Sequence, residues 1–347
     1  MSSKSLILVI PGDLSIQTGG YIYDRKLLAE LEKQGLSVSH LSLGDSFPKP
    51  NQADIQYARE KLSAFTHDDT LLIDGLALGA MDSEVMNSLR AKVVALIHHP
   101  LAYEGNLEPK LREQFFETER VNINACQHVI VPSHHTKNLL VQEYGIEGSK
   151  ITVAEPGIDF FECNQAKTDP PLVLSVGIQV HRKGHDVLLQ ALSQITHLDW
   201  QAVIAGSVHD KAYASELERL IAVFGLADRV KIQSSVSTSQ LNDLYCQASV
   251  FALATRYEGY GMVFAEAMSY GLPIISCQAG AVVDTVAAGA GKLVPVDDPE
   301  SFAKALSEVL TDQFLRNDMS AASEDAGKKL NSWKQTAEIV GRALESL

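Results

Sequence analysis

The chain has 347 residues, of which 46% are hydrophobic and 21% are charged, and its formal net charge at pH 7 is −14. This length suffices for two domains that each bury a core, and the composition is that of an ordinary globular protein. The acidic balance argues against general nucleic-acid binding and against a strongly basic membrane-binding surface. Weak peripheral membrane contact through an amphipathic face on residues 108–120 remains an open alternative to a solvated helix.

The cysteines and the start of the chain bear on the compartment. Residues 6–10 are already apolar, and the few residues before them are too short for a signal peptide, so we expect none. No apolar run approaches the roughly 20 residues that span a bilayer. The cysteines form no C-x-x-C pair, which predicts reduced structural thiols and a cytoplasmic protein. The four are scattered along the chain: Cys126, Cys163, Cys246 and Cys277.

Apolar runs in the first half of the chain predict buried strands. Between them lie helical patterns at residues 21–34 and 111–125. The connection after the first run contains Gly19-Gly20 and opens a helix, where glycines let the backbone approach a ligand and the helix start favours a phosphate. An ordinary loop would have the same residues. The predicted strands are residues 6–10, 71–73, 93–97, 129–131 and 151–153.

The second half repeats the pattern, with helices expected at residues 186–194, 214–224 and 300–310. The polar, proline-bearing segment 157–171 marks a domain boundary. Continuous apolar runs predict parallel strands buried on both faces, and alternating strands and helices predict doubly wound α/β sheets that bind ligands at the strands' carboxyl ends. The strands expected here are residues 172–176, 202–205, 230–232, 250–254, 274–276 and 293–296.

One stretch of the second half carries two glutamates eight positions apart, Glu258 and Glu266. On a single helix they would lie about 80° apart around the axis and roughly 12 Å apart along it, which suits no shared ligand atom. We therefore expect the helix to begin near Gly261 and to end before Pro273, with Glu258 in the preceding loop. Backbone N–H groups at that helix start favour an anion. A phosphate flanked by two carboxylates suits a nucleotide sugar.

A second candidate site follows the run 172–176. Gly177 is followed by Ile178, and Arg182-Lys183 come four positions later. Two cations in this turn could neutralise a diphosphate leaving group as a glycosidic bond breaks. Solvated turn cations would show the same pattern.

These motifs together resemble the retaining family 4 glycosyltransferases, which have the GT-B fold. The stretch from Glu258 to Pro273 resembles their E-x7-E signature, and Val94-Ala-Leu-Ile-His98 resembles the strand that ends in their active-site histidine. Ile178 is a departure, because the family usually has an arginine there. Further segments match in order over essentially the whole chain: Gly19-Gly20, Val129-Ile-Val-Pro-Ser133, Ala154-Glu-Pro-Gly157-Ile-Asp159, Val176-Gly177 with Lys183-Gly184, Gly280-Ala-Val-Val-Asp284 and Leu293-Val-Pro-x2-Asp298-Pro-Glu300.

The resemblance implies two Rossmann-like domains that face a central cleft. The first, residues 1–160, would bind the acceptor, and the second, residues 161–332, would bind the nucleotide sugar. Residues 333–347 would form a last helix that crosses back to the first domain. The fold class expected is thus α/β, of the GT-B type.

The resemblance also implies roles for single residues. His98 and Glu258 would contact the transferred sugar, Glu266 would bind the ribose, and residues 230–235 would contact the base largely through their backbone. Arg182 and Lys183 would hold the diphosphate, with Arg182 compensating for Ile178. The candidate catalytic residues are His98, Arg182, Lys183 and Glu258; the candidate donor-binding residues are Gly19, Gly20, Gly177, Arg182, Lys183, Val230, Ile232, Glu258, Gly261, Met262, Val263 and Glu266.

The activity implied is transfer of a hexose from a nucleotide-diphosphate sugar to a hydroxyl acceptor with retention of configuration. The leaving diphosphate would accept the proton, and neither a metal nor another cofactor is expected, since cations and helix starts can take the metal's place. Acceptor selection would rest on loops such as residues 13–18 and 101–109. A catalytically inactive nucleotide-binding or regulatory protein, a nucleotide-sugar epimerase and a glycoside hydrolase are the alternatives. The sequence determines neither the nucleotide, the sugar, the acceptor nor the oligomeric state.

Overall fold

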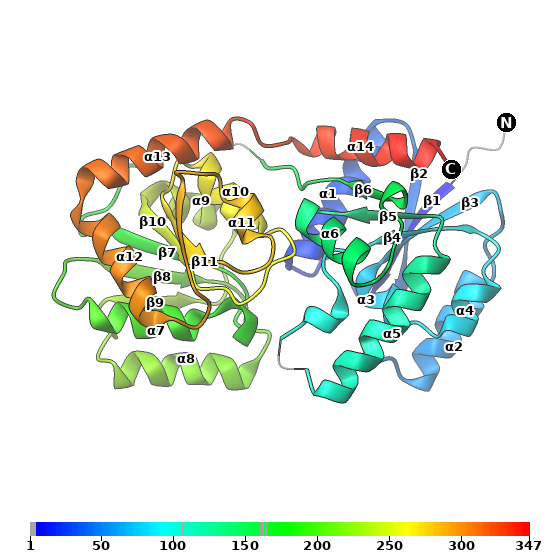
Figure 1. The fold of residues 1–347 in the computed structure, drawn as a ribbon, viewed down its shortest axis with the longest axis horizontal. Coiled ribbons are helices and arrows are strands. Elements are labelled where there is room, and N and C mark those ends of the chain that lie inside the picture. Colours follow the sequence, from blue (N-terminus) through cyan, green and yellow to red (C-terminus); the bar gives the residue numbers. More distant parts are fainter. Residues whose placement is uncertain (1–4, 106, 160, 162, 164) are drawn as a thin grey trace. The chain divides into compact units, whose positions relative to one another are not determined.

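The computed structural model describes residues 5–105, 107–159, 161, 163 and 165–347. The chain forms two compact units, of which the first comprises Met1–Gly157 and Asn331–Leu347 and the second Ile158–Leu330. Each unit has a sheet of six strands with helices packed around it (Figure 1). Both sheets are parallel throughout the described strand pairs.

The sheet of the first unit has the strand order β2-β1-β3-β4-β5-β6. The order reverses between β1 and β3, and such a switch point is where open α/β sheets bind ligands, beyond the strands' carboxyl ends. The strands are β1 (Ser5–Pro11), β2 (Ser37–Leu43), β3 (Asp69–Asp74), β4 (Lys92–Leu96), β5 (His128–Val131) and β6 (Ile151–Val153).

In the described part of the first unit, seven α-helices flank this sheet. The last of them, α14, lies beside α1, so the C-terminal segment completes the unit in which the chain begins (Figure 1). Ser332 caps α14 with a reciprocal capping box, which fixes the point at which this helix starts. The helices are α1 (Gly19–Lys33), α2 (Gln52–Leu62), α3 (Gly75–Leu78), α4 (Ser83–Ser88), α5 (Pro109–Ala125), α6 (His134–Gln142) and α14 (Trp333–Glu345).

The sheet of the second unit has the order β12-β11-β10-β7-β8-β9. Its switch point lies between β7 and β10, so the connections after these two strands lie next to each other at the carboxyl edge. Both strands are apolar and almost entirely buried, as expected for central parallel strands. The strands are β7 (Leu172–Val176), β8 (Gln201–Ala205), β9 (Val230–Gln233), β10 (Ala248–Leu253), β11 (Ile274–Cys277) and β12 (Gly291–Val294).

Helices of the second unit pack in pairs, α12 on α7 and α13 on α10. The core that they form with the sheet includes the large buried side chains of Trp200, Phe251 and Phe302. The helices are α7 (His185–Gln194), α8 (Lys211–Val223), α9 (Thr238–Gln247), α10 (Met262–Ser269), α11 (Val282–Thr285), α12 (Pro299–Thr311) and α13 (Gln313–Gly327).

The cysteine prediction was wrong. Cys163 and Cys246 form a disulfide that joins the segment after Ile158 to the end of α9, whereas Cys126 and Cys277 are buried thiols. The two bonded cysteines are 83 positions apart, and no local pattern indicates that folding brings them together. The cysteines therefore no longer support a reducing compartment. In the described part of the chain, no helix is both long and apolar enough to cross a membrane.

Candidate functional site

In the first unit, His98 follows β4 and faces the start of α1. A Cβ added to Gly20 would lie 3.0 Å from Cδ2 of His98, so the glycine allows the helix start to approach the imidazole ring. Gly19 is the first residue of the same helix. The structure therefore brings the Gly19-Gly20 pair next to His98, although the glycines and the histidine are distant in the sequence.

Two buried aspartates hold the imidazole of His98. Its Nε2 lies 3.0 Å from Oδ1 of Asp24 on α1 and 3.7 Å from Oδ2 of Asp74 at the end of β3. Burial lowers the pKa of His98, but the two carboxylates outweigh this effect and raise it above its usual value. Burial, with the nearby charge of Asp24, raises the pKa of Asp74 to about 7. The two aspartates therefore favour the imidazolium form of His98 and hold the ring in a fixed orientation.

The same three side chains could hold a metal. Each of Asp24, Asp74 and His98 offers one ligand atom, and these atoms lie within 4.8 Å of one another. The hydrogen bond and the ion pairs among them account for the arrangement without an ion. We interpret the cluster as a support for His98.

Tyr23 supports the other side of the His98 ring. The two rings meet edge to face at a centroid distance of 5.1 Å. The hydroxyl of Tyr23 donates to the carbonyl oxygen of Ala154 at 2.9 Å, and its ring also contacts Trp333 at the start of α14. Tyr23 thus connects His98 with the segments around Ala154 and Trp333. Both lie close to the points where the chain passes from one unit to the other.

The connection that follows His98 rests on Glu119, a fully buried residue of α5. Its carboxyl oxygens accept from the N–H of Leu101 at 3.1 and 3.2 Å, and one of them also accepts from the hydroxyl of Tyr144. Burial raises the pKa of Glu119 to about 8. Glu119 therefore anchors the backbone three residues beyond His98, which restricts the position of the histidine.

In the second unit, Lys183 and Arg182 converge on Glu258. Nζ of Lys183 lies 2.7 Å from Oε1 of Glu258, and Nη1 of Arg182 lies 3.5 Å from Oε2. The cations come from the turn after β7 and the carboxylate from the connection after β10, which are neighbours at the switch point. Consecutive residues of a turn commonly point apart, but here both cations face the same carboxylate.

Glu258 is ionised despite its burial. Desolvation would raise the pKa of Glu258, but the charges of Lys183 and Arg182 lower it below its usual value. The hydroxyl of Thr255 also donates to Oε1 at 2.9 Å. The three side chains at this point are nearly buried, with 6% exposure for Glu258, 12% for Lys183 and 14% for Arg182. The site therefore concentrates two positive charges and one negative charge where little water competes.

Two further residues fix the connections that carry these charges. Arg256 binds Asp186 at the start of α7 through both carboxylate oxygens, at 3.0 and 2.8 Å. His185 is fully buried, and its Nε2 lies 3.1 Å from the carbonyl oxygen of Gly177. Burial lowers the pKa of His185 to about 4, so the ring is neutral and donates to that carbonyl. The turn after β7 is thereby tied to α7 and to the connection after β10.

The helix that follows Glu258 begins where the sequence predicted. Gly261 is the N-cap of α10, Met262 and Val263 form its first turn, and Glu266 lies on its second turn. Burial and the charge of Asp159 raise the pKa of Glu266. The backbone N–H groups at this helix start point in the direction of the preceding loop, as in anion sites at helix termini.

Val230 and Ile232 lie apart from this group, on the edge strand β9. The side chain of Val230 is buried in the core, so its side chain is not available to a ligand. Gln179 approaches the end of this strand, since its amide donates to Oγ of Ser234 at 3.0 Å and to the carbonyl oxygen of Gly206 at 2.8 Å. Contacts with a base at this edge would therefore fall to the backbone and to residues just beyond β9.

Sequence reasoning missed several residues that shape the two groups. Most of the polar ones named below lie about one helical turn from a motif residue or in the connection beside it, but polar residues at such positions are common and carry no distinctive spacing. A carboxylate at the carboxyl end of a predicted strand, as at the end of β3, was the one available signal. The residues are Asp24, Asp74, Asp186, Thr255 and Arg256.

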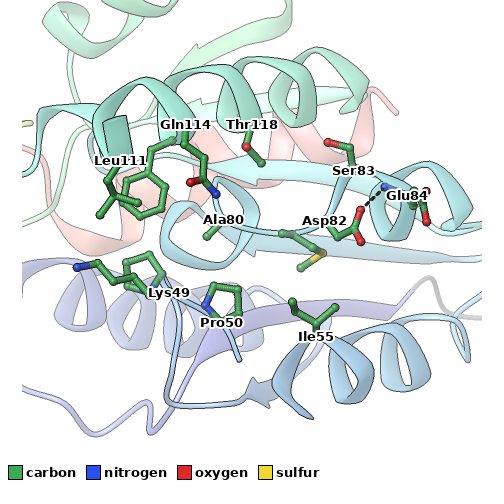
Figure 2. Close-up of a pocket in the computed structure, with 13 residues that line it drawn as sticks. Lys49, Pro50, Ile55, Ala80, Asp82, Ser83, Glu84, Leu111, Gln114 and Thr118 are labelled. Carbon is green, nitrogen blue, oxygen red and sulfur yellow. Dashed lines mark hydrogen bonds between the residues drawn. The ribbon is translucent and has the colours of Figure 1, made fainter. Parts of the chain in front are cut away.

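A cavity of about 650 Å³ lies elsewhere in the first unit, between the β2–α2 connection, the α3–α4 turn and α5 (Figure 2). Its lining includes the apolar side chains of Ile55 and Leu111 and the charged side chains of Lys49 and Asp82. Asp82 caps α4 by accepting from the N–H of Glu84 at 2.8 Å (Figure 2). The residues that line this cavity are distinct from those that the sequence motifs singled out.

Comparisons with known families fit this geometry. The family model described as "Glycosyltransferase Family 4" matches residues 66–160, which include His98. The model described as "Glycosyl transferases group 1" matches residues 159–326, which include both switch-point connections of the second unit. The chain belongs to the family 4 glycosyltransferases. The two models together cover His98, Asp74 and the whole charged group of the second unit, whereas Asp24 lies outside the matched residues.

Relatives and solved structures of these glycosyltransferases agree. A D-inositol 3-phosphate glycosyltransferase of Xylanimonas cellulosilytica is 30% identical over 236 residues, which are 62% of this chain and 56% of the relative. A GDP-mannose:cellobiosyl-diphosphopolyprenol alpha-mannosyltransferase of Xanthomonas oryzae is 26% identical over 92% of this chain and 83% of the relative. The chain thus spans little more than half the length of the first of these relatives.

The fold is that of GT-B glycosyltransferases. Sucrose-phosphate synthase of Thermosynechococcus elongatus has a TM-score of 0.83 at 20% identity, over 99% of this chain and 98% of that one. Anabaena HepE in complex with UDP and glucose has a TM-score of 0.76 at 16% identity, over 98% of this chain and 100% of that one. The predicted α/β class is therefore confirmed.

Proposed function

We propose that this protein transfers a hexose from a nucleotide-diphosphate sugar to a hydroxyl acceptor. The observation that carries the proposal is the convergence of Lys183 and Arg182 on Glu258 at the switch point of the second unit, beside the helix that carries Glu266. Two cations beside an ionised carboxylate match a diphosphate next to a hydroxyl-rich sugar.

Each charged group has a task in this reaction. Lys183 and Arg182 hold the diphosphate and stabilise the charge that it gains as it leaves. Glu258 accepts hydrogen bonds from hydroxyls of the sugar, and Glu266 accepts them from the ribose. We assign His98 to a contact with the sugar, and the two carboxylates beside its imidazole favour the protonated form that can donate to a sugar oxygen.

The reaction proposed proceeds with retention. The bond between the anomeric carbon and the diphosphate oxygen breaks, and the acceptor oxygen forms its bond to that carbon on the same face. The proton of the acceptor hydroxyl passes to an oxygen of the leaving diphosphate, so the balance requires neither an enzymatic nucleophile nor a metal.

Arg182 is proposed to replace the arginine that the family usually has at Ile178. Its guanidinium lies 3.5 Å from Glu258 and donates to the carbonyl oxygen of Tyr257 at 2.9 Å, so it faces the site. This position argues for a working donor site and against a catalytically inactive scaffold.

The test is titration calorimetry with UDP-, GDP- and ADP-sugars, GDP-mannose included, in the presence of EDTA. One donor class should bind, and Glu266→Ala and Lys183→Met should each weaken its binding at least tenfold. Arg182→Ala should weaken binding to a similar extent, and adding Ile178→Arg to Arg182→Ala should restore most of it. A folded protein that binds no donor, or that binds donors only with added Mg²⁺ or Mn²⁺, would contradict the proposal.

A further inference from the structure

Tyr245 on α9 contacts the second glutamate of the motif. Its hydroxyl donates a hydrogen bond to Oε2 of Glu266 at 2.8 Å, although the two residues lie on different helices and 21 positions apart. Tyr245 is 1% exposed, whereas Glu266 keeps part of its surface open to solvent. A ligand can therefore reach the glutamate but not the tyrosine.

The tyrosine ring has little freedom to move. It stacks on Tyr270 at a centroid distance of 4.9 Å and an interplanar angle of 8°, and on Phe251 at 6.1 Å and 19°. Tyr270 is fixed in turn, because its hydroxyl donates to Oδ1 of Asn242 on α9 at 2.9 Å. A stacked and buried ring holds its hydroxyl at one place, and so it determines the rotation of the carboxylate that accepts from it.

The charges favour one direction for this hydrogen bond. Burial and the nearby carboxylate of Glu266 raise the pKa of Tyr245, so the phenol keeps its proton and donates. Burial and Asp159 raise the pKa of Glu266, and the hydrogen bond from Tyr245 opposes that rise. Tyr245 thus favours the carboxylate form of Glu266, which accepts at both oxygens. Donation to Oε2 leaves Oε1 for a ligand.

We propose that Tyr245 is a positioning residue of the donor site, which orients Glu266 toward the ribose hydroxyls and thereby favours ribonucleotides over deoxyribonucleotides. The inference rests on the proposed function, because it takes Glu266 as the group that binds the ribose. Tyr245 does not touch the nucleotide itself. Its contribution therefore depends on whether the ligand carries hydroxyls for Glu266 to bind.

The experiment measures binding of UDP, GDP and ADP, and of the matching 2′,3′-dideoxynucleoside diphosphates, to Tyr245→Phe by calorimetry. Phenylalanine keeps the stacked ring and removes the donor. We expect Tyr245→Phe to weaken the ribonucleotide about tenfold and the dideoxy analogue less than about twofold. Tyr270→Phe is the matched control, since it belongs to the same stack but donates to Asn242; it should leave both affinities within about twofold.

Different results separate the two proposals. If Tyr245→Phe weakens both ligands equally, or neither, while Glu266→Gln weakens the ribonucleotide alone, the role of Tyr245 is refuted and the donor site stands. If Glu266→Gln affects both ligands alike, or the unaltered protein binds no nucleotide, the assignment of Glu266 fails and the inference fails with it. Thermal unfolding of each variant identifies any loss of affinity that comes from misfolding.

Discussion

The buried charges around Glu258 allow a quantitative test that requires no substrate. The variant Glu258→Gln keeps the volume of the side chain and an acceptor for Thr255 but removes the negative charge. Lys183 and Arg182 would then face each other at 12% and 14% exposure without the carboxylate between them. The variant therefore measures how strongly this region depends on that charge.

Removing one partner of a buried ion pair costs about 3–5 kcal/mol, because the remaining charge stays desolvated. Since glutamine keeps the hydrogen bond to Thr255, we expect a value near the lower end, about 3 kcal/mol of unfolding free energy. For a domain of this size that corresponds to a fall in melting temperature of about 6–12 °C. The pKa of Glu258 is lower in the folded state than its ordinary value of 4.5. Its contribution is therefore complete above pH 4.5 and is lost as the pH falls through the folded pKa.

Urea unfolding followed by circular dichroism at pH 7 and at acidic pH measures this difference. The control is Glu216→Gln, which removes an exposed partner of Arg219 in the same unit, where the side chains are 58% and 43% exposed. Exposed pairs contribute little to stability, because solvent screens their charges. If Glu258→Gln loses no more stability than Glu216→Gln, or if its deficit grows as the pH falls, the three charges do not form the stabilised group inferred from the structure.

Three further results are expected. Asp24→Asn should lower the pKa of His98, because it removes the carboxylate that most raises that pKa; NMR titration of the ring measures the change, and an unchanged titration would contradict the prediction. The stabilisation from this pair is present below the ordinary pKa of 6.5 and is lost as the pH rises through the folded pKa, so the variant should lose stability mainly under acidic conditions. Gly184→Ala should lower the free energy of unfolding in urea by at least about 2 kcal/mol. Gly184 has a φ of +64°, and an added Cβ would lie 1.8 Å from the carbonyl oxygen of Ala254; unaltered stability would show that the turn rearranges freely. Reduction should destabilise the protein by roughly 2–4 kcal/mol, because the Cys163–Cys246 bond closes a separation of 83 residues, and equal urea midpoints for the oxidised and reduced protein would contradict this.

The sequence by itself determined the α/β class, the two parallel sheets and the position of most buried strands. Central parallel strands are buried on both faces, so their apolar residues run continuously and can be recognised without the fold. It also determined that α10 begins after Gly261, because a helix carrying both Glu258 and Glu266 would point them apart. It missed β2, which is an edge strand with many exposed residues and therefore an irregular apolar pattern.

Only the tertiary structure decided which side chains meet. That Arg182 faces Glu258, that Asp24 and Asp74 hold His98, and that Tyr245 donates to Glu266 all depend on how separate strands and helices pack. These pairs lie between 21 and 76 positions apart in the chain, far beyond the reach of local periodicity. The sequence thus identifies the motif residues, but the charge state and orientation of each depend on neighbouring side chains that only folding brings close.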